Sequence, residues 1–177
     1  VRQALESHPE LEADTAGLSD AEILARIGAS EKHLEGLFFP DTYLFDKRSG
    51  ALAVLKRAYG AMQAQLERTW AERDPATPLA SPYEALILAS IIEKETGRPE
   101  DRALVASVFS NRLRIGMRLQ TDPSVIYGLG PDFDGRLRRS HLDTDHPWNT
   151  YTRVGLPPTP IAIPGAAALR AAVPPQK

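Results

Sequence analysis

The sequence predicts a helix-rich α+β fold with a few short strands or extended pieces. Apolar residues recur at intervals of three and four along several stretches, which is the spacing of one face of an α-helix. Strand and helix patterns do not alternate, which argues against a doubly wound sheet. One aromatic, β-prone stretch, residues 34–45, is broken by Gly36 and Pro40 and predicts short extended segments joined by turns.

We expect two parts, a polar and helical lead-in over residues 1–33 and one main domain over 34–177, since 177 residues suit a single core. Within the lead-in, Ser19 and Glu22 have the spacing of a capping box. They predict a short helix that ends at Gly28, because glycine readily adopts the left-handed conformation that ends helices.

After the extended stretch of residues 34–45, the main part has a long helix that Ser49 could cap. Its apolar face consists of Leu52, Leu55, Tyr59, Met62 and Leu66.

The strongest helix start is Ser81-Pro82-Tyr83-Glu84, which combines a serine cap, proline at the first helical position and glutamate at the third. The residues from Ala85 to Glu95 are apolar on nearly every side, which predicts a buried helix.

Further helices are expected over residues 100–114 and 165–173. Residues 128–150 look like polar loop, and residues 154–164 like a rigid Pro-rich loop. The core side of the first of these helices is predicted to consist of Leu104, Val105, Val108, Phe109 and Leu113.

Composition excludes several classes of function. The formal net charge of −2 predicts no nucleic-acid partner. The absence of cysteine removes disulfides and thiolate chemistry. No Gly-rich phosphate loop, no apolar run of the roughly 20 residues that span a bilayer and no signal peptide is visible, and we expect no cofactor.

Two carboxylates, Glu93 and Glu95, stand at the end of the predicted buried helix. They point about 200° apart at 3.6 residues per turn, so only one of them can face a given cleft. Glu95 continues an aliphatic stripe and lies at the negative end of the helix dipole, and both features favour a protonated general acid. Two solvated glutamates at a surface helix end are the ordinary alternative.

Two other constellations are weaker. The stretch His141-Leu142-Asp143-Thr144-Asp145-His146 has the composition of metal ligands but none of the specific spacings, so it is interpreted as a polar loop with no metal. A Ser–His–Asp triad lacks the Gly-x-Ser-x-Gly elbow.

Several segments in order resemble one known family. They are Glu35-Gly36, Phe39-Pro40-Asp41-Thr42, Ala89-Ser90-Ile91-Ile92-Glu93-Lys94-Glu95-Thr96, Val105–Leu113, Gly116–Pro123, Val125–Gly128, Asn149-Thr150-Tyr151 and Gly155-Leu156-Pro157-Pro158. Together they are similar to the MltG (YceG-like) endolytic murein transglycosylases over roughly residues 34–170.

The resemblance implies a lysozyme-like catalytic domain in which Glu95 is the catalytic residue. It makes Asn111, Gln120, Asp122, Tyr127, Asn149 and Tyr151 candidate substrate-binding residues. Amide and phenol groups suit the hydroxyl and acetamido groups of sugars, although Asn111 and Gln120 could instead hold loops in place. Glu35, in its aromatic setting, is a weaker candidate to support the site.

The resemblance also implies a setting. Family members have an N-terminal helix in the bacterial inner membrane and a LysM-like domain, and they continue beyond the equivalent of Lys177. The domain is therefore expected to face the periplasm, to act on peptidoglycan glycan strands, and to work with peptidoglycan synthases.

The implied reaction cleaves the β-1,4 bond between MurNAc and GlcNAc and leaves a 1,6-anhydro end. One carboxylate suffices, because the nucleophile belongs to the substrate, whereas ordinary glycosidases use a pair. A non-catalytic glycan-binding or docking module and a hydrolytic muramidase stay open as alternatives, and Asp122 is the candidate second carboxylate for the latter.

Overall fold

The computed structural model describes residues 1–174, and its regular structure is helical. In chain order the elements are α1 (Arg2–Glu6), α2 (Asp20–Ile27), α3 (Ala51–Ala71), α4 (Pro82–Glu95), the 3₁₀ turn η1 (Pro99–Asp101), α5 (Arg102–Arg114), α6 (Asp122–Leu129), the 3₁₀ turn η2 (Gly130–Asp132), α7 (Arg139–Asp143) and α8 (Ala166–Ala172).

The expected short strands do not form within residues 1–174, where β-pairing is limited to isolated bridge residues, namely the parallel pair Glu12 and Gly50, and Arg73. Residues 34–45 run as turns and irregular chain with no neighbouring strand. Gly36 takes a left-handed φ of 80°, and a Cβ there would lie 2.5 Å from the Pro160 ring. The segment therefore packs closely against the Pro-rich loop instead of pairing.

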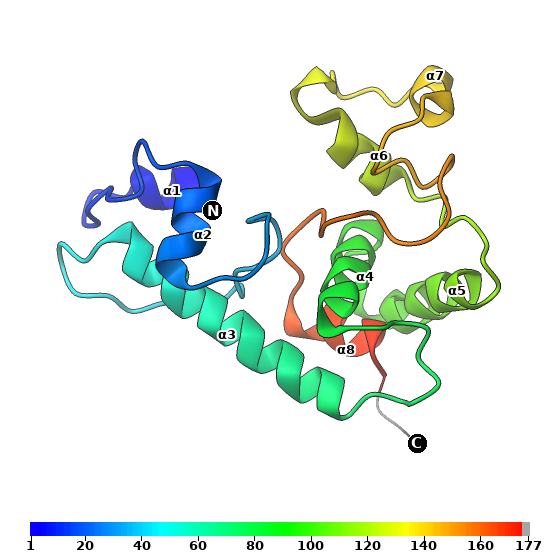
Figure 1. Ribbon diagram of the computed structural model, residues 1–177, viewed down its shortest axis with the longest axis horizontal. Helices are drawn as coiled ribbons and strands as arrows, with labels where there is room; N and C mark the ends of the chain where they lie inside the picture. The colour runs from blue at the N-terminus through cyan, green and yellow to red at the C-terminus, as the bar shows by residue number, and fades with distance from the viewer. Residues whose placement is uncertain (175–177) are drawn as a thin grey trace.

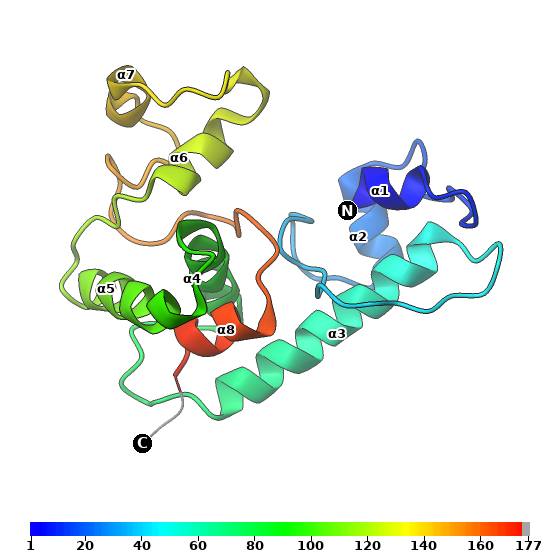
Figure 2. The ribbon, with the colours of Figure 1, turned by 180° about the vertical axis from the view of Figure 1, so that it is seen from behind.

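Helix α4 is the centre of the fold. It packs against α3, α5, α6 and α8, and Figure 1 and Figure 2 show it enclosed by these elements while α1 and α2 lie at the far end of α3. The capping predicted from sequence is confirmed, since the Ser81 hydroxyl accepts the Glu84 N–H at 3.2 Å and Pro82 occupies the first turn. The eight consecutive residues Ala85–Ile92 are buried.

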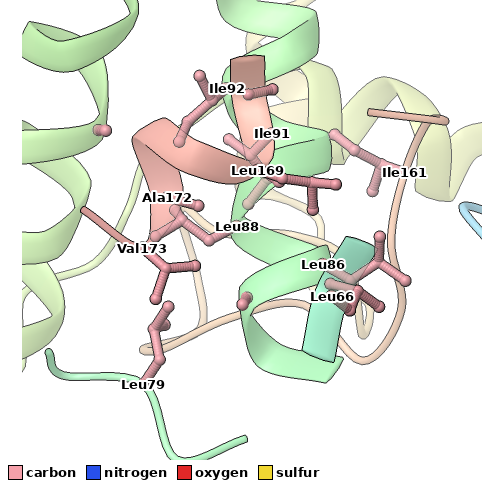
Figure 3. Close-up of a cluster of buried hydrophobic side chains, with 14 of the residues drawn as sticks. Leu66, Leu79, Leu86, Leu88, Ile91, Ile92, Ile161, Leu169, Ala172 and Val173 are labelled. Carbon is pink, nitrogen blue, oxygen red and sulfur yellow. The ribbon is translucent and has the colours of Figure 1, made fainter. Parts of the chain in front are cut away.

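The core around α4 is aliphatic. Figure 3 shows Leu88, Ile91 and Ile92 of α4 among side chains from α3, α8 and the loops that flank them. Full burial of each such side chain stabilises the fold by about 1.5–3 kcal/mol. This packing fixes the end of α4, and with it the position of Glu95.

The N-terminal helices pack on α3. The capping box at the start of α2 is confirmed, with the Ser19 N–H donating to Glu22 Oε2 at 2.7 Å. Ile23 and Ile27 are buried in a second cluster with Leu55 of α3. Gly28 ends α2 in the left-handed conformation, as predicted.

Helix α5 corrects one prediction. Leu104 is 66% exposed and Val108 is 41% exposed, so they do not belong to its core side. Ala106 and Phe109 are the buried residues of this helix, with Val105 and Leu113 packed partly against the core. The helix is therefore rotated relative to the face that its apolar residues predicted.

Residues 115–153 form a loop-rich segment above the ends of α4 and α5 (Figure 1). It contains α6 and α7, neither of which the sequence pattern predicted. None of the helices described between residues 1 and 174 has the length and apolarity to cross a bilayer.

Candidate functional site

Glu95 is the last residue of α4, and its side chain is exposed. The aliphatic stripe behind it is fully buried, so the carboxyl projects out of the core into solvent and is not enclosed by that stripe. Its Oε1 accepts a hydrogen bond from the Thr121 hydroxyl. Its Oε2 has no hydrogen-bond or ion-pair partner in the part of the chain that is described, and is free to meet a ligand.

A buried hydroxyl network holds Thr121. The Thr121 N–H donates to Thr150 Oγ1 at 3.0 Å, and Ser124 Oγ donates to the Thr121 carbonyl at 3.0 Å. The hydroxyls of Ser124 and Thr150 lie 2.9 Å apart. All three residues are at most 2% exposed, which makes their hydrogen bonds strong and costly to break. The network fixes the donor that orients Glu95.

Asp122 and Tyr151 form a pair next to Glu95. The Tyr151 hydroxyl donates to Asp122 Oδ1 at 2.5 Å. Burial, and then this hydrogen bond, raise the pKa of Tyr151 to about 12, and the negative charge of Glu95 contributes further. The phenol is therefore neutral at physiological pH, with its proton donated to Asp122 and its oxygen able to accept a hydrogen bond.

Glu93 bonds to a different part of the chain from Glu95. Its Oε2 accepts the backbone N–H of Gly165 at 3.0 Å, immediately before α8. On the same face of α4, Ser90 Oγ accepts the N–H of Ile161 at 3.0 Å. These bonds tie the Pro-rich loop to α4. The two carboxyls thus meet different elements, as the 200° divergence predicted.

Gln120 and Tyr151 border a polar pocket of about 490 Å³. Gln120 is exposed and holds a left-handed φ of 54°, while its N–H donates to the Thr150 carbonyl at 3.1 Å. A non-glycine residue in this conformation costs energy and persists only where its surroundings fix it. The conformation leaves the Gln120 side chain at the pocket wall.

Asn149, a predicted substrate-binding residue, is enclosed by backbone. It is 0% exposed. Its Nδ2 donates to the carbonyls of Leu142 at 3.0 Å and Thr144 at 2.7 Å, and its Oδ1 accepts the Tyr151 N–H at 2.9 Å. With both ends of the amide used by backbone, Asn149 positions the segment that carries Tyr151 and has no capacity left for a sugar.

Asn111 lies apart from this group. Its Oδ1 accepts from Arg114 Nη1 at 2.7 Å, and it borders a separate pocket of about 290 Å³ with Asp74 and Arg170. That pocket shares no lining residue with the pocket of Gln120 and Tyr151. The structure therefore does not bring Asn111 to Glu95.

Tyr127 is half-buried on α6 and packs against Trp148, with ring centroids 5.9 Å apart. Burial, and then the negative charge of Glu35, raise the pKa of Tyr127. The Trp148 indole N–H donates to Thr159 Oγ1 at 2.9 Å. Tyr127 and Glu35 thus lie near one another, on a side of α6 that has no described contact with Glu95.

The His- and Asp-containing stretch of residues 141–146 makes ion-pair and hydrogen-bond contacts within the fold. The Asp145 carboxylate accepts from Arg153 Nε and Nη2, both at 3.0 Å, and its pKa is lowered to about 2, mainly by Arg153. His146 Nδ1 accepts the Trp148 N–H at 3.2 Å, and burial lowers the pKa of His146. Within residues 1–174 no three His, Asp or Glu side chains are placed to hold a metal ion.

Sequence reasoning missed Thr121. A threonine immediately before Asp122-Pro123 has the pattern of a helix N-cap, and Thr121 is the N-cap residue of α6. Its side chain makes no capping bond and donates to Glu95 instead. The sequence marks Thr121 as a helix cap, but only the structure shows that its hydroxyl bonds to Glu95 and not to the start of α6.

Comparisons with known proteins show which family the chain belongs to. The chain is 39% identical over 147 residues to an endolytic murein transglycosylase from Bacillus subtilis (strain 168), which is 82% of this chain and 40% of that protein. It is 31% identical over 149 residues to an endolytic murein transglycosylase from Streptococcus pneumoniae serotype 2, covering 79% of this chain and 26% of that protein. The chain thus spans less than half the length of these relatives.

One solved structure of a yceG-like protein has a similar fold. The crystal structure of a yceG-like protein from Listeria monocytogenes superposes with a TM-score of 0.71 at 34% identity, over 89% of this chain and 54% of that one. The model of the YceG-like family matches residues 1–177, the whole sequence. The chain therefore belongs to the YceG-like family.

Proposed function

We propose that this chain carries the catalytic part of an endolytic peptidoglycan lytic transglycosylase, with Glu95 as acid and base. The observation that carries the proposal is the Glu95 carboxyl, which is oriented at one oxygen by Thr121 and free at the other. The names of the Bacillus and Streptococcus relatives support the choice of substrate. A lysozyme-like arrangement of the helices around α4 is part of the same proposal.

The reaction uses one protein carboxyl twice. Protonated Glu95 gives its proton to the glycosidic oxygen as the bond from muramyl C1 to that oxygen breaks, and the GlcNAc-bearing strand leaves as an alcohol. The Glu95 carboxylate then removes the proton from the muramyl 6-hydroxyl, whose oxygen bonds to C1. The product carries a 1,6-anhydro ring, no water is added, and Glu95 ends protonated again.

The neighbouring groups fit this scheme. In this scheme Glu93 accepts the Gly165 N–H and holds the loop before α8, and Glu95 alone serves as acid and base. Tyr151 and Gln120 provide neutral hydrogen-bonding groups of the kind that hold sugar hydroxyls and acetamido groups. Asp122 accepts from Tyr151 and sets the direction of that phenol. Asn149 acts as a positioning residue for the same segment.

The proposed setting follows from the substrate. Peptidoglycan lies outside the cytoplasmic membrane, so the domain works on the periplasmic side of the inner membrane. The intact protein is anchored in that membrane, and its partners are peptidoglycan synthases that supply nascent strands.

Two other functions make different predictions. A hydrolytic muramidase needs a second carboxylate to activate water, and Asp122 is the candidate because it lies beside Tyr151 on the Glu95 side. A glycan-binding module would hold strands without cutting them. The chemical identity of the new strand ends separates all three.

The test is incubation with uncrosslinked glycan strands, followed by mass spectrometry of the product ends. The chain is expected to release anhydro-muramyl ends, and Glu95→Gln is expected to release none. Glu93→Gln is the matched control, because it makes the same chemical change two residues away and keeps an acceptor for Gly165.

Reducing ends would overturn the transglycosylase in favour of the muramidase. Strand binding without cleavage by the unmodified chain would favour the binding module. Equal loss of activity in Glu93→Gln and Glu95→Gln would contradict the assignment of the acid and base to Glu95.

A further inference from the structure

The pocket bordered by Gln120 and Tyr151 also has a charged side, which the proposed reaction does not use. We name it the Arg118 pocket, and it is bordered by Arg118, Gln120, Arg139, Leu142, Asp143 and Tyr151. Its volume is about 490 Å³, enough for a substituent of a sugar in addition to water. It joins the connection after α5 to α7 and to the segment after Asn149.

The charge of this pocket is not balanced. Arg139 Nε lies 3.1 Å from Asp143 Oδ2, so those two charges offset each other. Arg118 is exposed and makes no ion pair or side-chain hydrogen bond within residues 1–174. Two other arginines of the segment, Arg138 and Arg153, each have an aspartate partner. Arg118 therefore brings a free guanidinium to the pocket wall.

The pocket is close to the proposed catalytic group. Gln120 directly precedes Thr121, the residue that donates to Glu95. Tyr151 borders the pocket and lies within the electrostatic influence of Glu95. A sugar whose glycosidic oxygen meets Glu95 would therefore have this pocket on the side of Gln120 and Tyr151.

The substrate carries a suitable anion at one position. The glycan backbone is neutral, and the proposed reaction requires the muramyl 6-hydroxyl to be free. Negative charge on the muramyl residue is then confined to the lactyl group on O3, as a free carboxylate or, where a stem peptide is attached, as the carboxylates of that peptide. A guanidinium binds carboxylates through paired, charge-assisted hydrogen bonds.

We propose that the Arg118 pocket binds a carboxylate of the substituent on muramyl O3, and that Arg118 is a specificity-determining residue. The inference rests on the proposed function, since it takes peptidoglycan as the substrate. Arg118 holds the muramyl residue in register with Glu95, so its contribution lies in binding and not in bond cleavage.

The test measures binding in a Glu95→Gln background, by calorimetry, so that turnover is not required. Three fragments of equal length are compared: one with stem peptides, one stripped to the free lactyl carboxylate, and one stripped and then amidated to neutrality. Adding Arg118→Ala is expected to weaken binding of at least one of the two carboxylate-bearing fragments by about tenfold, the scale of one charge-assisted contact. The neutral fragment is expected to bind equally to both proteins.

The fragments also identify the source of the carboxylate. A loss confined to the peptide-bearing fragment assigns the pocket to the stem peptide, and a loss confined to the stripped fragment assigns it to the lactyl group. Arg118→Lys is expected to keep part of the affinity, because it retains the charge without the paired donors. Arg26→Ala, an exposed arginine on α2, is the matched control and is expected to change nothing.

No loss for either carboxylate-bearing fragment would overturn the inference, as would an equal loss for the neutral one. In the active chain, Arg118→Ala is expected to raise KM for the same fragment about tenfold and to leave kcat unchanged. A chain that binds in this selective way but never cuts would refute the proposed function alone. A chain that cuts with no preference for carboxylates would refute this inference alone.

Discussion

The helical core around α4 and the loop-rich segment over residues 115–153 are stabilised in different ways. In α4, eight consecutive residues are buried, and seven of them are apolar. In α6 only Ser124 and Val125 are buried, and α7 has no buried residue. Hydrogen bonds replace apolar burial there: Thr150 accepts from Thr121, Asp145 accepts from Arg153, and Asn149 donates to Thr144.

This difference separates two tasks. The aliphatic core gives Glu95 a rigid base, because close-packed side chains resist displacement. The polar segment holds Thr121 and Tyr151 near Glu95 with little apolar burial, and a region with few buried apolar contacts opens locally at a lower free energy than the core. Damage to the core should therefore affect the whole fold, whereas damage to the segment should affect the site first.

Leu88→Ala should have the largest effect on stability. Leu88 is 0% exposed at the centre of the core (Figure 3), and its truncation leaves a cavity. We expect the free energy of unfolding to fall by about 2–5 kcal/mol, measured by urea denaturation. Leu104→Ala is the control, since that leucine is 66% exposed on α5 and should lose little. Equal losses would contradict the burial difference.

Asn149→Ala should loosen the segment without unfolding the core. The change leaves the carbonyls of Leu142 and Thr144 and the N–H of Tyr151 without their partner. A polar group that loses its partner and is kept from water costs about 1–3 kcal/mol, and we expect local opening to expose these partly buried groups to water instead. Hydrogen exchange should accelerate over residues 139–153 and stay unchanged in Ala85–Ile92.

Asn149→Asp refines the same test. It keeps the acceptor for the Tyr151 N–H but loses the donor to the three carbonyls of residues 141, 142 and 144. Faster exchange at residues 141–144 is expected, with residue 151 less affected. Uniform acceleration through α4 would show that the segment and the core open together.

Thr121→Val should act on the site more than on stability. Valine has nearly the shape of threonine but lacks the hydroxyl that donates to Glu95. Loss of one such hydrogen bond is expected to lower kcat by about tenfold, measured by release of strand ends. Thr121→Ser restores the donor and should recover most of the rate. A Thr121→Val enzyme with full activity would show that Glu95 does not depend on this bond.

The sequence predicted the core better than the segment. Helix α4, its cap at Ser81 and the helical face of Leu55, Met62 and Leu66 all follow from local periodicity and capping patterns. Such signals work because burial imposes a period of 3.6 residues on the chain. Leu104 shows the limit, since an apolar residue at helical spacing can still be exposed.

The segment was less predictable because its order comes from contacts that are distant in sequence. Thr121 meets Glu95 across 26 residues, and Tyr151 meets Asp122 across 29. No periodic pattern encodes such pairs. The resemblance named Asp122 and Tyr151 together but also named Asn111, which lies elsewhere, and Asn149, whose amide is fully used by backbone.

The smallest expected effect is the loss of stability when acid protonates Asp145. Arg153 lowers the pKa of Asp145 from its ordinary 3.8 to about 2. A carboxyl whose pKa is lower in the folded state stabilises the fold above pH 3.8, and this contribution disappears as the pH falls through about 2. The stability difference between the unmodified chain and Asp145→Asn, measured by thermal unfolding, should therefore be largest near neutral pH and vanish below pH 2. Because the ion pair is at the surface, the difference should also shrink in high salt. Parallel pH profiles for the two proteins would show that the Asp145–Arg153 pair does not stabilise the segment.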